Sequence, residues 1–230
     1  MFDVIAFDAD DTLWHNETLY SATQAQFEAL LATYNLTDGA LDRLYETEMR
    51  NLQHYGYGIK SFTLSMIETA IEMTGGTVTG RDVQRIIDMA REMLASPVQL
   101  IDGVAEVLPA LAASHTLMLI TKGDLFDQET KIARSGVAPY FEYVEIVADK
   151  TPSTYRTIMD KHGIEPRQFL MVGNSLRSDV LPVTALGARA VHIPYAITWK
   201  HEAVGGDGAS GNYVELAHIG LLPAFVAESS

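Results

Sequence analysis

The 230-residue sequence contains no cysteine and few basic residues. Without cysteine there can be no disulfide, no thiolate metal site and no cysteine nucleophile, and such a composition is typical of a reducing compartment. Sixteen Lys and Arg residues stand against 30 Asp and Glu residues, which gives a formal net charge of −14. Because so acidic a surface repels phosphodiester backbones, we expect no nucleic-acid partner.

The sequence also lacks a hydrophobic run long enough to cross a membrane. The longest uncharged run, 107–121, has about 15 residues, against the roughly 20 that a spanning helix needs. The apolar start at 2–7 has no basic segment before it and continues directly into Asp8, unlike a signal peptide. We therefore expect a cytoplasmic protein with no membrane partner.

Short apolar stretches alternate with helical stretches at the start of the chain and after residue 97. Buried strands are predicted at 2–7, 116–120, 143–147, 169–172 and 190–193, and helices at 104–113, 128–135, 152–162 and 181–186. Strands that alternate with helices form parallel sheets that are covered on both faces. The predicted fold class is therefore α/β, with a Rossmann-like, doubly wound parallel sheet as its core.

Residues 16–96 differ from the rest, because they show helical periodicity and no good strand. Four apolar stripes at helical spacing predict four helices, and Asp38 and Thr79 are predicted N-caps. The sequence thus indicates an all-α, four-helix insert at 16–96 within an α/β core of 1–15 and 97–230. The Gly-rich stretch 204–211 is predicted to be a mobile loop.

A cluster of carboxylates follows the first predicted strand, in the segment Asp-Ala-Asp-Asp-Thr at 8–12. Ligands of open α/β sheets bind at the carboxyl ends of the strands, which is where Asp8 and Asp10 fall. Neighbouring carboxylates repel each other unless a cation or a proton is present. Taken alone, the cluster is equally consistent with a solvated acidic turn, and Asp11 is predicted to be a surface carboxylate.

The other predicted strands also end in polar groups. Thr121 and Lys122 end the second strand, Lys150 follows the third, and Asn174 and Asp179 follow the fourth. Because parallel strands end at the same edge of a sheet, we expect acids, a hydroxyl, a lysine and an amide to lie together there.

The order of these motifs resembles that of the haloacid dehalogenase superfamily, whose members are mostly phosphatases. The resemblance covers the whole chain, as a core strand, a helical cap insert and the rest of the core. Four family motifs are matched in order, by Asp8, Asp10 and Thr12, by Thr121, by Lys150 with Pro152, and by Gly173, Asn174 and Asp179.

The resemblance implies a phosphatase that acts on a small phosphorylated metabolite through an aspartyl-phosphate. It makes Asp8 the nucleophile, and Asp10 the acid that protonates the leaving oxygen and then the base that activates water. Thr121 and Lys150 would hold the transferring phosphoryl group. Dehalogenases of this superfamily lack the second Asp, since their leaving group needs no proton, so Asp10 favours a phosphate ester as substrate.

The resemblance also implies a Mg²⁺ cofactor. Its ligands would be the Asp8 carboxylate, the main-chain carbonyl of Asp10, and Asn174, Asp179 or both. Asn174 stands where many members have Asp, and the loss of one negative charge is expected to weaken metal binding without abolishing it.

Five side chains are further candidates for binding the substrate: Thr12, His15, Tyr57, Lys60 and Lys122. Tyr57 and Lys60 belong to a segment with two glycines, 55–60, and in members with helical caps such a loop faces the core site and selects the leaving group. The alternatives are a hinge residue for His15, an interhelical turn for 55–60 and a surface position for Lys122.

Two other functions stay open. A phosphomutase uses the same intermediate but passes the phosphoryl group to a sugar. A non-catalytic phospho-aspartate signalling or binding protein also gathers acids around Mg²⁺, although such modules carry no large helical insert after the first strand. The sequence determines neither the particular substrate nor the oligomeric state.

Overall fold

The computed structural model describes residues 2–36, 38–197, 199–202 and 213–229. The chain divides into two compact units. The core unit comprises 1–17, 98–122 and 128–230, and the helical unit comprises 18–97 and 123–127. The role of the helical unit as a cap stays a prediction, and the predicted loop at 204–211 lies outside the described residues.

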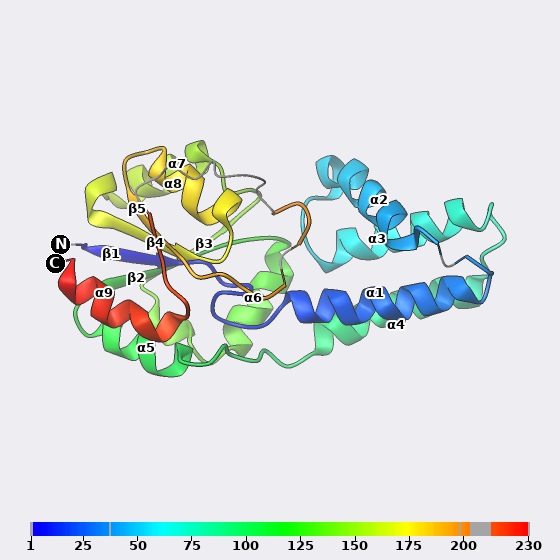
Figure 1. Cartoon of the computed structure of the whole chain (residues 1–230), viewed down its shortest axis with the longest axis horizontal. Helices are drawn as coiled ribbons and strands as arrows, with labels where there is room; N and C mark the ends of the chain where they lie inside the picture. Colours follow the sequence, from blue (N-terminus) through cyan, green and yellow to red (C-terminus); the bar gives the residue numbers. More distant parts are fainter. Residues whose placement is uncertain (1, 37, 198, 203–212, 230) are drawn as a thin grey trace. The chain divides into compact units, whose positions relative to one another are not determined.

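Within the described residues, the core unit is built on a six-stranded parallel sheet (Figure 1). Its strands are β1 (Val4–Phe7), β2 (Thr116–Lys122), β3 (Tyr143–Val147), β4 (Phe169–Gly173), β5 (Arg189–His192) and β6 (Tyr213–Glu215). They lie in the order β3-β2-β1-β4-β5-β6, which is the doubly wound order of a Rossmann-like sheet. The predicted fold class is therefore confirmed. Every residue of β1 and β4 is buried, which explains their continuous apolar sequence.

Helices cover both faces of this sheet. They are α5 (Val104–Ala112), α6 (Leu125–Arg134), α7 (Pro152–His162), α8 (Leu181–Thr184) and α9 (Leu222–Glu228). Ile5 and Phe7 of β1 pack in one apolar cluster with α5 and α9, while Val4 and Ala6 pack in another with α7 and α8 (Figure 1). The alternation follows from the two-residue period of a strand, so β1 anchors the core on both faces.

Three features of the fold differ from the sequence-based expectation. Strand β6 and helix α9 were not predicted. Helix α6 begins at Leu125, three residues before its predicted start at 128. The reason is Asp124, whose Oδ1 accepts a hydrogen bond from the amide of Asp127 at 3.1 Å and so caps the first turn.

The helical unit contains α1 (Glu17–Ala32), which starts in the core unit, α2 (Ala40–Tyr55), α3 (Ile59–Met73) and α4 (Gly80–Ala95). Their apolar stripes meet in one cluster, whose fully buried members include Phe27, Leu44, Met66 and Ile86. Burial of one face of each helix accounts for the periodicity of the sequence. No helix among the described residues is both long and apolar enough to cross a membrane.

The two predicted N-caps have different outcomes. Thr79 caps α4, because its Oγ1 accepts a hydrogen bond from the amide of Asp82 at 3.2 Å. The prediction for Asp38 is wrong, since α2 is preceded by Gly39 with no side-chain cap. Gly39 has a φ of 75°, a left-handed conformation that glycine adopts at little cost.

Candidate active site

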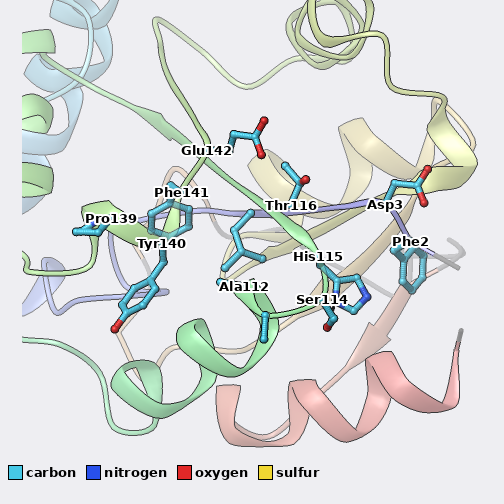
Figure 2. A pocket seen from close by; sticks show the side chains of 12 residues that line it. Phe2, Asp3, Ala112, Ser114, His115, Thr116, Pro139, Tyr140, Phe141 and Glu142 are labelled. Carbon is cyan, nitrogen blue, oxygen red and sulfur yellow. Dashed lines mark hydrogen bonds between the residues drawn. The ribbon is translucent and has the colours of Figure 1, made fainter.

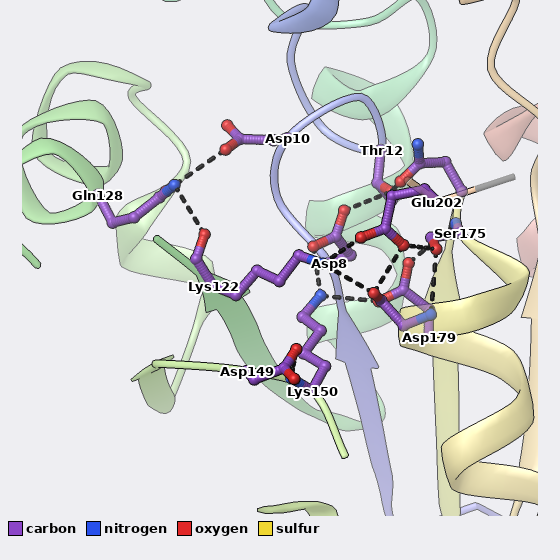
Figure 3. Close-up of polar contacts among 12 residues, drawn as sticks. Asp8, Asp10, Thr12, Lys122, Gln128, Asp149, Lys150, Ser175, Asp179 and Glu202 are labelled. Carbon is purple, nitrogen blue, oxygen red and sulfur yellow. Dashed lines mark hydrogen bonds and ion pairs between the residues drawn. The ribbon is translucent and has the colours of Figure 1, made fainter. Parts of the chain in front are cut away.

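The polar residues that follow the strands gather at the carboxyl edge of the core sheet (Figure 3). Asp8 follows β1, and its amide donates to the carbonyl of Val172 in β4 at 2.9 Å. Thr121 and Lys122 close β2, and Lys150 lies between β3 and α7. The parallel topology therefore brings these groups together, although Asp8 and its contact Lys150 are 142 residues apart in the sequence.

Lys150 is the centre of a buried ionic network. Its ammonium contacts Asp8 Oδ1 and Asp179 Oδ1, the latter at 2.7 Å, and all three residues are buried. Burial opposes the charge of Lys150, but the two carboxylates outweigh this and raise its pKa. Burial also raises the pKa of Asp8 to about 7, with Asp179 adding to the shift and Lys150 opposing it. Additional positive charge near Asp8 would therefore favour its ionised, nucleophilic form.

Asp179 is held in place by its surroundings as well as by Lys150. It belongs to a π-helical turn, η3 (Leu176–Val180), and its Oδ2 accepts a hydrogen bond from the amide of Ser175 at 3.0 Å. A Cβ on Gly173 would lie only 2.3 Å from the Asp179 carboxyl group, so this approach requires glycine. Both carboxylate oxygens of Asp179 thus accept hydrogen bonds, one of them from Lys150, and its predicted role as a metal ligand stays a prediction.

Thr12 contacts both the second oxygen of Asp8 and the side chain of Asn174. Thr12 Oγ1 donates to Asp8 Oδ2 at 3.0 Å and lies 3.3 Å from Asn174 Oδ1. A hydroxyl has one hydrogen, so it satisfies only one of these two oxygens at a time. Carboxylate and amide oxygens that converge in this way suit Mg²⁺, as does the main-chain carbonyl of Asp10.

The described part of the chain contains no group of three or more His, Asp and Glu side chains placed to hold a metal ion. A metal at this edge would therefore need amide, main-chain or water oxygens besides the Asp8 carboxylate. That donor set fits Mg²⁺, which keeps several waters and uses few carboxylates.

Asp10 is held by three donors, two of which come from α6, and Figure 3 shows one of these, Gln128. Trp14 Nε1 donates to Oδ1 at 2.7 Å, Gln128 Nε2 donates to Oδ2 at 2.9 Å, and Lys131 Nζ contacts both oxygens at 2.7 and 2.8 Å. Burial alone would raise the pKa of Asp10, but the charge of Lys131 and the three hydrogen-bond donors lower it. Sequence reasoning missed Gln128 and Lys131, whose i,i+3 spacing on one helix face was the available signal.

Asp11 is not the surface carboxylate that the sequence suggested. It is buried and caps the first turn of α1, since Oδ1 accepts hydrogen bonds from the amides of Asn16 and Glu17 at 2.9 and 3.1 Å. Its φ of 60° is in the left-handed region, and burial raises its pKa to about 6. Asp11 therefore shapes the turn that aims Asp10.

Lys122 takes part in a second polar cluster with a residue that sequence reasoning missed. Its ammonium contacts Glu202 and donates to Ser178 Oγ at 2.9 Å, and Glu202 also accepts hydrogen bonds from Ser175 and Ser178 (Figure 3). Burial would raise the pKa of Glu202, but Lys122 and the hydroxyls lower it to about 2. No sequence motif marks Glu202, which follows β5 in a segment without regular structure.

The remaining candidates lie in different surroundings. His15 Nδ1 is 2.6 Å from the hydroxyl of Tyr195 in the core unit. In the helical unit, Tyr57 is partly buried between α2 and α3, and Lys60 forms an ion pair with Asp124 at 2.9 Å. Substrate-binding roles for these three residues stay predictions.

A pocket of about 670 Å³ lies at the other edge of the sheet (Figure 2). Residues at the starts of β1 and β2 line it, among them Asp3 and His115. It contains none of the predicted site residues, so chemistry rather than volume identifies the candidate active site.

The fold and the site define a class of α/β proteins with an aspartate and lysine site at the carboxyl edge of a Rossmann-like sheet. The chain belongs to the haloacid dehalogenase-like hydrolases, because the model of that family matches residues 2–187. The protein is thus a hydrolase, and its family implies a small-molecule substrate.

Solved structures agree with this assignment. A haloacid dehalogenase-like family hydrolase from Xanthomonas campestris is 41% identical, with a TM-score of 0.89 over 99% of this chain and 91% of that one. A predicted phosphoglycolate phosphatase from Haemophilus somnus 129PT is 16% identical, with a TM-score of 0.66 over 98% of each chain.

An L-2-haloacid dehalogenase from Xanthobacter autotrophicus, with chloropropionic acid covalently bound, is 17% identical, with a TM-score of 0.70 over 100% of each chain. It and the predicted phosphatase share the fold alone, so they do not decide the substrate. The comparison with curated proteins found no match.

Proposed function

We propose that this hydrolase is a Mg²⁺-dependent phosphatase that acts on a small phosphorylated metabolite through an aspartyl-phosphate. The observation that carries the proposal is Asp10, a second carboxylate two residues after Asp8, held by Trp14, Gln128 and Lys131. The leaving oxygen of a phosphate ester needs a proton, whereas a halide leaves without one. Asp10 is held in place to serve first as the acid and then as the base, and this supports a phosphate ester as the substrate.

The reaction has two steps. In the first, Asp8 attacks phosphorus, the bond from phosphorus to the leaving oxygen breaks, and Asp10 gives its proton to that oxygen. In the second, water attacks phosphorus, its proton passes to Asp10, and inorganic phosphate leaves as the Asp8 carboxylate is restored. Thr121 and Lys150 hold the phosphoryl oxygens, since phosphoryl transfer depends mainly on positioning and charge stabilisation.

The environment of Asp10 suits the second step better than the first. Lys131 favours the ionised form, which is the form that accepts a proton from water. For the first step Asp10 must be protonated, and an incoming phosphate dianion near Asp10 would raise its pKa. We therefore expect substrate binding to promote the protonated form.

The charge balance supports a divalent cation. These networks contain four carboxylates, of Asp8, Asp10, Asp179 and Glu202, and three ammonium groups, of Lys122, Lys131 and Lys150. Their formal charges sum to one net negative charge. A phosphate dianion would meet repulsion there. Mg²⁺ held by Asp8, the Asp10 carbonyl and Asn174 would reverse the sign and stabilise charge on the phosphoryl oxygens.

The test is release of inorganic phosphate from p-nitrophenyl phosphate, with Mg²⁺ and with EDTA. We expect turnover that requires Mg²⁺ and falls by about 10³-fold or more in Asp8→Asn, because the nucleophile is lost. Asp102→Asn is the matched control, since Asp102 is an exposed acid of the same unit.

A loss of less than about tenfold in Asp8→Asn would contradict the assignment of the nucleophile. Chloride release from 2-chloropropionate without phosphatase activity would contradict the substrate class. Transfer of the phosphoryl group to a sugar, in place of phosphate release, would identify a phosphomutase.

A further inference from the structure

The side chains around Glu202 form a set of donors suited to an anion, and the Glu202 carboxylate occupies it. One carboxylate oxygen contacts the Lys122 ammonium, and the other accepts hydrogen bonds from Ser175 and Ser178, at 2.7 Å from Ser178. The side chains of Lys122 and Glu202 are only 16% and 12% exposed. Such donors, an ammonium and two hydroxyls, would also suit a phosphate or carboxylate group of a ligand.

Glu202 itself is poorly placed to bind a cationic group of a substrate. Both of its oxygens already have donors, and its charge is balanced by Lys122 within the cluster. The main electrostatic effect of Glu202 is therefore on Lys122, whose ammonium it neutralises at close range.

The cluster is linked to the buried network of Asp8 and Lys150, because the amide of Ser175 donates to Asp179 Oδ2 at 3.0 Å and Asp179 contacts Lys150. Lys122 directly follows Thr121, which is proposed to hold the phosphoryl group, and Ser175 directly follows Asn174, a proposed metal ligand. Glu202 lies outside residues 2–187, which are matched by the family model. Glu202 matches none of the four motifs that carry the proposed chemistry, so we consider it for specificity rather than for catalysis.

We propose that Glu202 is a specificity-determining residue that makes the enzyme prefer phosphate esters with an uncharged leaving group. By occupying Lys122, Ser175 and Ser178, it withholds their donors from a second anionic group of a substrate and repels that group. This inference rests on the proposed phosphatase function. Selectivity obtained by repulsion of the wrong ligand is a general device of binding sites.

The experiment compares two substrates that differ by one carboxylate, ethyl phosphate and 2-phosphoglycolate. The readout is the ratio of their kcat/KM values. Any effect of a substitution on the phosphoryl group that both substrates share cancels from this ratio. In the wild type we expect ethyl phosphate to be preferred. In Glu202→Gln we expect the ratio to shift by about tenfold or more toward 2-phosphoglycolate, because the negative charge that repels the second anionic group is removed from beside Lys122.

The double variant Lys122→Gln/Glu202→Gln is the matched control. It removes both charges, so the shift seen in Glu202→Gln should disappear if the charge of Lys122 causes it. Thermal melting of both variants checks that they fold. If Glu202 had a purely structural role, its substitution would change kcat/KM equally for both substrates and leave their ratio unchanged.

The outcomes separate the two proposals. A ratio in Glu202→Gln within about twofold of the wild type, or an equal shift in the double variant, would overturn the specificity role alone. If the wild type releases phosphate from no ester with Mg²⁺, the proposed function fails and the specificity role fails with it.

Discussion

Both units contain a network in which cations share carboxylates, but the two networks differ in burial. In the helical unit, Arg50 contacts Glu68 at 3.2 Å and Glu72 at 2.8 Å, with side chains 34–44% exposed. In the core unit, Lys150 contacts Asp8 and Asp179, with side chains 1–10% exposed. In these two networks, the same pairing of charges is thus exposed to water in one unit and buried in the protein interior in the other.

The difference in burial predicts a difference in purpose. Exposed ion pairs contribute about 0–1 kcal/mol, because water screens them and the side chains lose freedom. Buried pairs lose several kcal/mol of hydration per ion, which their mutual attraction repays only in good geometry. A well-packed apolar core could replace such a buried network at little cost to stability. We therefore infer that the network around the proposed nucleophile is retained for chemistry.

The largest effect is expected for Lys150→Met. This change leaves Asp8 and Asp179 buried without their cation, so the free energy of unfolding should fall by about 3–5 kcal/mol. Phosphatase turnover should fall by about 10²-fold or more, since a donor to the phosphoryl group is lost. Urea denaturation and phosphate release measure the two effects.

Arg50→Met provides the matched comparison for Lys150→Met, because it removes a cation with two carboxylate partners in the helical unit. Equal destabilisation by the two changes would show that burial does not distinguish the networks. Loss of stability in Lys150→Met with full turnover would separate the buried network from the chemistry.

A smaller, pH-dependent effect is expected for Lys131→Met. Lys131 lowers the pKa of Asp10, so its removal should raise that pKa. The first step needs protonated Asp10, and activity falls as the pH rises above this pKa. The high-pH limb of the kcat profile with ethyl phosphate should therefore move to higher pH.

An alkyl phosphate is required for this measurement, because p-nitrophenolate leaves without a proton. Lys161→Met is the control, since Lys161 is an exposed lysine of the core unit that pairs with Glu145 at 2.7 Å. A limb that stays in place, or moves to lower pH, would show that Lys131 does not control the protonation of Asp10.

Most of the fold could be predicted because its elements depend on local patterns. Strands β1 and β4 are continuous apolar runs, and the stripes of α1 to α4 repeat at helical spacing. Strand β6 has only three residues and α9 only seven, which is too short for a periodic pattern to stand out. The early start of α6 depends on a single side chain, Asp124.

The site was predictable where a residue directly follows a strand, as with Asp8 and Asn174, or comes shortly after one, as with Lys150 after β3. Gln128 and Lys131 contact Asp10 across 118 and 121 residues, and Glu202 contacts Lys122 across 80. Such contacts depend on tertiary packing, which periodicity does not encode. For the same reason, the sequence does not show that Thr12 contacts both Asp8 Oδ2 and Asn174, or that both oxygens of Asp179 accept hydrogen bonds. Which of Asn174 and Asp179 would ligate a metal stays a prediction.

The smallest effect is expected for Arg50→Gln, which tests the exposed side of the comparison. We expect the free energy of unfolding to change by less than about 1 kcal/mol, because Glu68 and Glu72 remain hydrated after the charge is lost. Asn51 Nδ2 still donates to Glu68 Oε2 at 2.8 Å, so part of the network persists. Urea denaturation at low and high salt measures the change, which should shrink as salt screens the exposed charges. A loss of about 3 kcal/mol that persists at high salt would place this network in the energetic class of the buried one, and burial would then no longer explain why the charges around Asp8 are retained.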